Sequence, residues 1–103
     1  MKLNVLERLT LLGVLQAHVG NFLTLGIVND TVSILAMTDK EFKKFGIKQV
    51  GEQITWNPEG SKEKEIEIGE KATEIIVEDL KKMDQMKKLE QKHFSLYKKF
   101  VEK

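Results

Sequence analysis

The segment at residues 47–56, with the sequence IKQVGEQITW, constrains the fold of this chain more than any other. Two short runs of alternating apolar and polar residues flank the pair Gly51-Glu52, and this pattern is typical of a β-hairpin with a tight turn. We expect Val50, Ile54 and Trp56 to face inward. Helical patterns precede and follow the hairpin. The sequence therefore predicts an α+β fold, with N-terminal helices, a small antiparallel sheet that includes the hairpin, and C-terminal amphipathic helices.

The chain has 103 residues, which is about the length of one domain, and we expect a single domain over residues 1–103. Seventeen basic and sixteen acidic residues leave a net charge of +1, so no overall field draws the protein to nucleic acid or to an anionic membrane. The absence of cysteine excludes disulfides, thiolate catalysis and sulfur-ligated metals. It also fits a reducing cytoplasm.

Residues 9–29 carry no charge and are numerous enough to span a bilayer. Gln16, His18, Gly20 and Asn21 lie near the middle of this stretch, where a spanning helix would bury them in hydrocarbon. They are better explained as a turn between two apolar helices. We therefore expect no membrane segment.

The first helix is predicted over about residues 5–17, because Asn4 and Glu7 have the spacing of a capping box. Leucines recur along it at helical spacing, and Leu11 and Val14 widen its apolar face. A face this broad is either central to the core or part of an interface. Because so small a core cannot hide all of it, we predict that Leu9, Leu11 and Val14 take part in a symmetric oligomer.

Two more helices are predicted before the hairpin. Asn21 can cap a second helix, whose apolar side would hold Leu25, Val28, Val32 and Leu35. Thr38 and Glu41 form another capping box, and Gly46 can end a short third helix at residues 39–45.

The segment after the hairpin is harder to assign. Residues 65–68 alternate charged and apolar residues as a third strand would, after a charged connection. The alternative is a helix that begins at Pro58 with Asn57 as its cap. Gly60 and Gly69 make one uninterrupted helix from there unfavourable.

Two C-terminal helices follow. The first begins at Glu70 and repeats apolar residues at three and four; the second covers about 91–102. We expect Phe94, Tyr97 and Phe100 to lie on one side of the last helix and to pack on the domain or on a neighbouring subunit. Residues 59–79 carry eight acids and three lysines, and residues 80–103 carry eight lysines and three acids. Helix electrostatics explains this asymmetry, and contact between the acidic part of one chain and the basic tail of another is the alternative.

Catalytic and metal sites are not indicated. His18 and His93 lie in different halves of the chain, and the former has no acidic residue beside it at metal-supporting spacing. No nucleophile, base and orienting group can be named together, so we expect no enzymatic activity, no metal and no cofactor. No residue pattern argues for a nucleotide bound between subunits.

Nucleic-acid binding is the main alternative to association with proteins. Three helices followed by a hairpin are in the order of a winged helix, which would place Lys40, Lys43, Lys44 and Lys48 on the third helix and the wing. The one arginine, Arg8, is on the first helix, and lysines alone give weak, salt-sensitive binding to phosphates.

Three segments, GEQITWN at 51–57, KEKEI at 62–66 and HFSLYKKF at 93–100, resemble in style and order small accessory proteins encoded by bacteriophages and prophages. That class has no single activity and no catalytic residues to carry over. The resemblance implies a cytoplasmic protein of an infected or lysogenic bacterium that binds a host protein, a phage protein or itself. We therefore expect a non-catalytic accessory or inhibitor protein that self-assembles, with a winged-helix-like DNA-binding protein as the alternative.

Overall fold

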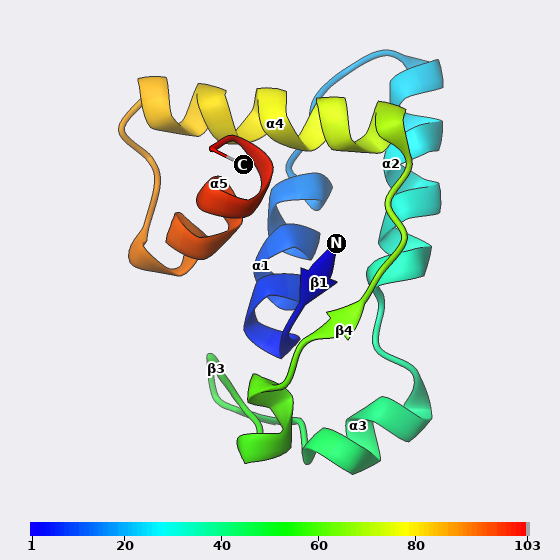
Figure 1. Cartoon of the computed structure of the whole chain (residues 1–103), viewed down its shortest axis with the longest axis vertical. Coiled ribbons are helices and arrows are strands. Elements are labelled where there is room, and N and C mark those ends of the chain that lie inside the picture. Colours follow the sequence, from blue (N-terminus) through cyan, green and yellow to red (C-terminus); the bar gives the residue numbers. More distant parts are fainter. Residues whose placement is uncertain (103) are drawn as a thin grey trace.

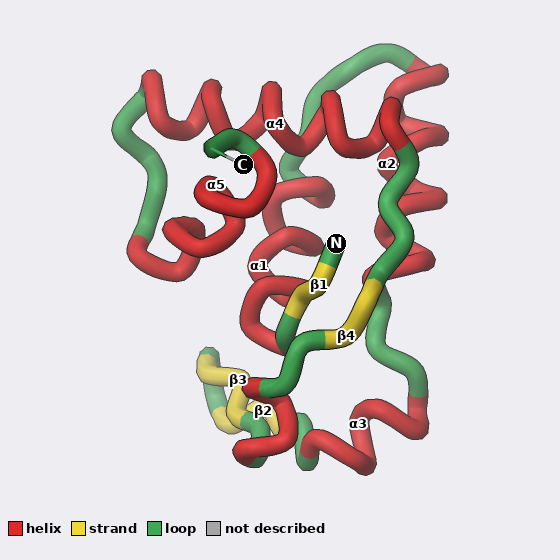
Figure 2. Tube along the Cα trace, viewed as in Figure 1, coloured by secondary structure: helices red, strands yellow, loops and turns green. Residues whose placement is uncertain are grey.

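The computed structural model describes residues 1–102, which form an α+β fold (Figures 1 and 2). The helices are α1 (Val5–Gln16), α2 (Phe22–Leu35), α3 (Asp39–Phe45), α4 (Glu70–Gln85) and α5 (Phe94–Phe100). The strands are β1 (Lys2–Leu3), β2 (Lys48–Val50), β3 (Gln53–Thr55) and β4 (Lys64–Glu65). Two 3₁₀ helices, η1 (Pro58–Ser61) and η2 (Gln91–His93), complete the order.

The helix boundaries predicted from capping residues are confirmed. The Asn4 side chain accepts a hydrogen bond from the Glu7 amide at 2.9 Å, and the Glu7 carboxylate accepts one from the Asn4 amide at 3.0 Å. Thr38 and Glu41 make the same reciprocal pair at the start of α3. Gly46 ends α3 with a φ of 57°, a left-handed conformation that glycine adopts without steric cost.

The predicted third strand exists, but it is shorter and pairs elsewhere. Strand β4 runs antiparallel to β1, with Lys2 opposite Glu65, so the start of the chain is paired with a segment more than sixty residues away. The Ile66 amide continues the ladder by donating to the Met1 carbonyl at 2.8 Å. The described residues therefore contain two separate two-stranded sheets instead of one.

The hairpin of β2 and β3 forms as predicted, with Gly51 in the turn at a φ of 63°. The prediction that Val50 and Ile54 face inward is wrong, because both are exposed on a ribbon whose residues are all solvent-accessible. Trp56 is half-buried and lies so close to Gly60 in η1 that a Cβ there would come within 2.5 Å of the indole. The helix suggested from Pro58 thus lasts for a single 3₁₀ turn.

Helix α1 is the centre of the molecule. It contacts α2, α4, α5 and both 3₁₀ helices, and Figure 1 shows it between α2 and α5 with α4 running across their ends. The main core cluster draws on β1, α1, α2, the residue after β4, α4 and α5: Leu3, Leu11, Val14, Leu15, Val28, Leu35, Ile66, Ile76, Leu80, Leu96 and Phe100.

The prediction that Leu11 and Val14 form an oligomer interface is therefore wrong. Both are buried in the chain's own core, and Leu9 is half-buried. The broad apolar face of the first helix is explained by its neighbours: other elements surround it on several sides, so it needs apolar residues on more than one stripe.

The three aromatic residues predicted on one side of the last helix differ in burial within the chain, and packing on a neighbouring subunit stays a prediction. Phe100 is 2% exposed, but Phe94 is 57% exposed, and Tyr97 is half-buried with its hydroxyl 3.3 Å from Asp84. Each step of three residues rotates a side chain by about 60° from the previous one, so residues 94 and 100 diverge by about 120°. The buried face is instead set by Leu96 and Phe100.

A buried ion pair connects α1, α2 and α3. The Arg8 guanidinium, 2% exposed, lies 2.5 Å from the Glu41 carboxylate and donates to the Leu35 and Ala36 carbonyls, both at 3.1 Å. These carbonyls belong to the C-terminal end of α2, where a helix carries partial negative charge. The hydrogen bond from Arg8 holds the pKa of Glu41 at about 2, against an ordinary value of 4.5.

A second ionic cluster fastens α5 to the start of the chain. Lys99 donates to Glu7 and to the Lys2 carbonyl, both at 2.8 Å, and it also pairs with Glu63. Burial lowers the pKa of Lys99, but its hydrogen bonds to Glu63 and Glu7 outweigh that effect and keep the pKa above its ordinary value.

We predict that Glu41→Gln lowers the free energy of unfolding at pH 7 by about 3 kcal/mol, because the pKa of Glu41 is 4.5 in the unfolded chain and about 2 in the folded one. Because the folded-state pKa is below the unfolded one, this stabilisation is present above pH 4.5 and is lost as the pH falls towards 2. Urea unfolding at pH 7 and pH 3 measures it. Glu67→Gln, at an exposed position, is the control, and an equal loss in both variants would contradict the prediction.

We also predict that Phe100→Ala lowers the free energy of unfolding by about 3–5 kcal/mol, because it leaves a cavity in the core. Phe94→Ala removes the same atoms from an exposed position and should change it by about 0.5 kcal/mol or less. Urea unfolding followed by circular dichroism distinguishes them. Comparable losses would mean that Phe94 is covered in solution.

Candidate functional site

The outer face of α2 is an apolar surface that the described chain leaves uncovered. Phe22 is 93% exposed, Leu23 75% and Ile34 51%, and Val19, just before the helix, is 88% exposed. Figure 1 shows α2 at the edge of the molecule, with no element on its outer side. We call Val19, Phe22, Leu23 and Ile34 the α2 patch.

The α2 patch was not predicted from the sequence, because we expected apolar residues on one side of this helix only. Val28 and Leu35 are buried and Val32 is half-buried, as expected, but Leu25 is exposed. The available signal was that α2 carries apolar residues all round and a single charge, Asp30. A helix that is apolar all round is usually covered on all sides.

Gly26 lies at the middle of the outer face of α2. With 3.6 residues per turn, Gly26 shares this face with Phe22 and Leu23 towards the N-terminal end of α2 and with Asp30 and Ser33 towards its C-terminal end. A Cβ at Gly26 would meet no atom within 4 Å, so nothing in this chain requires glycine there. Glycine inside a helix costs about 0.5–1 kcal/mol relative to alanine, and close approach of another backbone is one reason for it.

The four lysines of the DNA-binding alternative are exposed. Lys40, Lys43 and Lys44 lie on α3 and Lys48 begins β2, directly after it. Lys44 lies over the Phe45 ring, 5.7 Å from its centroid. Arg8, whose guanidinium could have formed bidentate contacts with a base, is buried against Glu41 instead.

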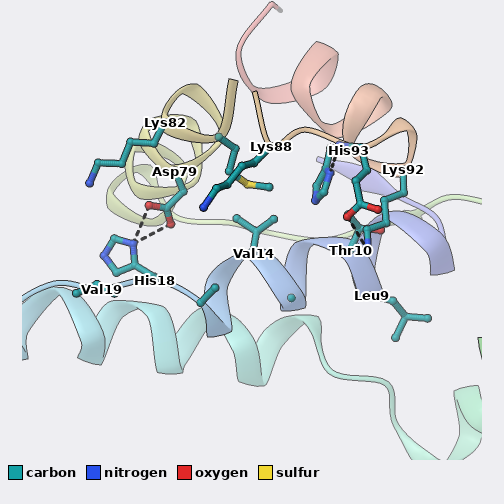
Figure 3. A pocket seen from close by; sticks show the side chains of 14 residues that line it. Leu9, Thr10, Val14, His18, Val19, Asp79, Lys82, Lys88, Lys92 and His93 are labelled. Carbon is teal, nitrogen blue, oxygen red and sulfur yellow. Dashed lines mark hydrogen bonds and ion pairs between the residues drawn. The ribbon is translucent and has the colours of Figure 1, made fainter. Parts of the chain in front are cut away.

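The structure brings the two histidines to one cavity, although they are 75 positions apart in sequence. The cavity has a volume of about 500 Å³ and lies between α1, α4 and the connection from α4 to α5 (Figure 3). Leu9 and Val14, two of the predicted interface residues, line it. No local pattern could have indicated this meeting, because it depends on how α4 crosses α1.

His18, just after the end of α1, pairs with an acidic residue that is distant in sequence. Its Nδ1 lies 2.8 Å from both carboxylate oxygens of Asp79 on α4, and both side chains are largely buried. Its Nε2 is buried without a partner among the described residues and lies beside Gly20, where a Cβ would come within 2.9 Å of it. This pair connects the end of α1 to α4, and its free nitrogen is not open to a substrate.

Within residues 1–102, no three or more His, Asp or Glu side chains are grouped to hold a metal ion. None of the helices in that range is both long and apolar enough to cross a bilayer. Comparisons with protein-family models, with curated proteins and with solved structures found no match to this chain. The contacts, burial and charge of the protein's own residues are therefore the basis for inferring its function.

Proposed function

We propose that this protein is a non-catalytic accessory or inhibitor protein of phage type, which acts by protein–protein association and self-assembly. The single observation that carries this is the exposed apolar α2 patch. The resemblance of three segments to phage and prophage accessory proteins supports the phage type, a bacterial cytoplasm as its location, and a host or phage protein as a further partner. The burial of the free His18 nitrogen supports a role without catalysis.

A second copy of the chain is the occupant that fits the α2 patch. The outer face carries no basic residue and one acid, so it offers nothing to nucleic acid or to an anionic membrane. Three of its four large apolar side chains, Val19, Phe22 and Leu23, are at least 75% exposed. Monomers rarely leave apolar residues grouped in this way unless the surface binds a partner.

The order of residues on α2 is self-complementary when two copies pair antiparallel. A two-fold axis level with residue 28 places Phe22 of one copy against Ser33 of the other, and Leu23 beside Ile34. Gly26 then lies beside Asp30. Phe22 therefore meets a small side chain, Leu23 and Ile34 make an apolar contact, and the absence of a side chain at Gly26 lets the two helices approach closely.

We predict that the wild-type protein has twice the mass of one chain in light scattering at high micromolar concentration. Phe22→Glu and Ile34→Glu should each give single chains, because each removes apolar contact area and adds a second acid to a face that already carries Asp30. Gly26→Trp should do the same by separating the helices. Phe22 and Ile34 are exposed in the single chain and a Cβ at Gly26 would meet no atom within 4 Å, so the circular dichroism spectrum should be unchanged.

Val50→Glu is the matched control, because Val50 is equally exposed and apolar but lies on the hairpin. It should leave the dimer intact. A wild-type protein that stays a single chain at high concentration would overturn self-assembly through α2. Dissociation by Val50→Glu alone would place the interface on the hairpin.

DNA binding through α3 and the hairpin is the second candidate, and the exposure of all four lysines there is what favours it. Contacts to phosphate from lysine give affinity without sequence preference. The burial of Arg8 removes the side chain best suited to read a base edge. The four lysines and two exposed acids of this region, Asp39 and Glu52, leave only a modest positive charge.

We predict that duplex DNA binds weakly and without sequence preference, and that Lys43→Glu with Lys44→Glu lowers the slope of log K against log salt by about 2 units. Fluorescence anisotropy at several salt concentrations measures it. Lys71→Glu with Lys81→Glu, an equal charge change on α4, should leave the slope unchanged. Tight, sequence-selective binding abolished by the first pair would make DNA binding the principal function.

A further inference from the structure

The cavity between α1 and α4 has the composition of a small-molecule site. Its volume of about 500 Å³ is within the range of ligand pockets, about 300–1,000 Å³. Leu9, Val14 and Met83 give it apolar walls. Few polar groups reach it from the interior, which is the usual pattern of a site that holds an apolar body and orients it through one end.

His93 is a buried donor turned into this cavity. The residue is 5% exposed, and its Nδ1 accepts a hydrogen bond from the Glu90 amide at 2.9 Å. Burial lowers the pKa of His93, and the nearby Lys92 lowers it further, so the ring is neutral with its proton on Nε2. Figure 3 shows the ring turned towards Val14 and Thr10 on α1, and no residue among 1–102 accepts from Nε2.

Thr10 adds a second buried polar group to the lining. It is 7% exposed, and its hydroxyl has no hydrogen-bond partner among residues 1–102. The hydroxyl is open to the cavity and not sealed from it, so it can bind an acceptor atom of a ligand. Thr10 and His93 come from α1 and η2, so the two groups converge from opposite walls.

The charges at the mouth leave a small positive excess. Lys82, Lys88 and Lys92 line it together with Asp79 and Glu90. Asp79 is held by His18, and Glu90 lies 3.7 Å from Lys92. No acidic side chain within residues 1–102 pairs with Lys82 or Lys88, so two ammonium groups remain available.

We infer that this cavity binds a small organic anion, whose apolar body lies between Leu9, Val14 and Met83 and whose carboxylate or phosphate group meets Lys82 and Lys88. His93 Nε2 and the Thr10 hydroxyl bind acceptor atoms at its inner end. This site shares Val19 with the α2 patch but does not require self-assembly.

Gly13 supplies a way to close the cavity without disturbing the fold. It lies inside α1 and lines the cavity, and a Cβ there would meet no atom within 4 Å. Gly13→Leu therefore fills the space from a helix that accepts leucine better than glycine. The variant should fold with at least the wild-type melting temperature.

Titration of the ¹⁵N-labelled protein with 2-naphthoate, 2-naphthyl phosphate and the uncharged 2-naphthol tests the inference. We expect saturable shifts of the amide resonances of Gly13, Lys88 and His93 with both anions. The affinity for the neutral probe should be lower by about tenfold or more, because 2-naphthol lacks the contacts with the two ammonium groups. Equal affinity for 2-naphthol would overturn the anion preference, and a lack of saturable shifts with either anion would overturn the site.

Matched variants separate this site from the rest of the surface. Gly13→Leu should abolish the shifts, and Lys82→Gln with Lys88→Gln should weaken both anions about tenfold. Gly26→Leu, the same change at the other mid-helix glycine, and Lys71→Gln, on the first turn of α4, should leave binding unchanged. Anion binding that survives Gly13→Leu would place the ligand elsewhere. A preference for one of the two anions would identify the charged group.

Discussion

The ion pair between Arg8 and Glu41 is the constraint on which much of the structure depends. Taking two charges out of water is costly unless each is well hydrogen-bonded, and here the guanidinium also binds the last carbonyls of α2. Glu41 is at the same time the third residue of the α3 capping box. One contact therefore fixes where α2 ends, where α3 begins, and how both lie against α1.

This arrangement also decides which face of α2 is left open. With its C-terminal end held by Arg8 and its inner side buried through Val28 and Leu35, α2 has α1 and α4 on one side only. The apolar residues on its outer side then have no neighbour in the chain. A core of this size cannot surround two apolar helices. Because it surrounds α1, the apolar residues that stay exposed are those on α2.

The cavity beside α1 depends on contacts between distant segments. Asp79 reaches His18 across 61 positions, and the connection after α4 carries His93 back over Thr10. Both associations follow from the crossing of α4 over α1 and from the docking of α5 by Lys99. The two features proposed as functional therefore lie on different sides of one scaffold, the outer face of α2 and the cleft between α1 and α4.

The sequence by itself determined the local structure, because helix caps, turn glycines and hydrophobic periodicity act over three or four residues. Asn4 with Glu7, Thr38 with Glu41, Gly46 and Gly51 all do what their spacing predicts. Only the tertiary structure decided which apolar residues are buried: Leu11 and Val14 are in the core, while Val50, Phe94 and Phe22 are exposed. It also decided the pairing of β1 with β4 and the meeting of His18 with Asp79. Burial depends on what lies across from a residue, and that neighbour comes from a part of the chain that local patterns do not specify.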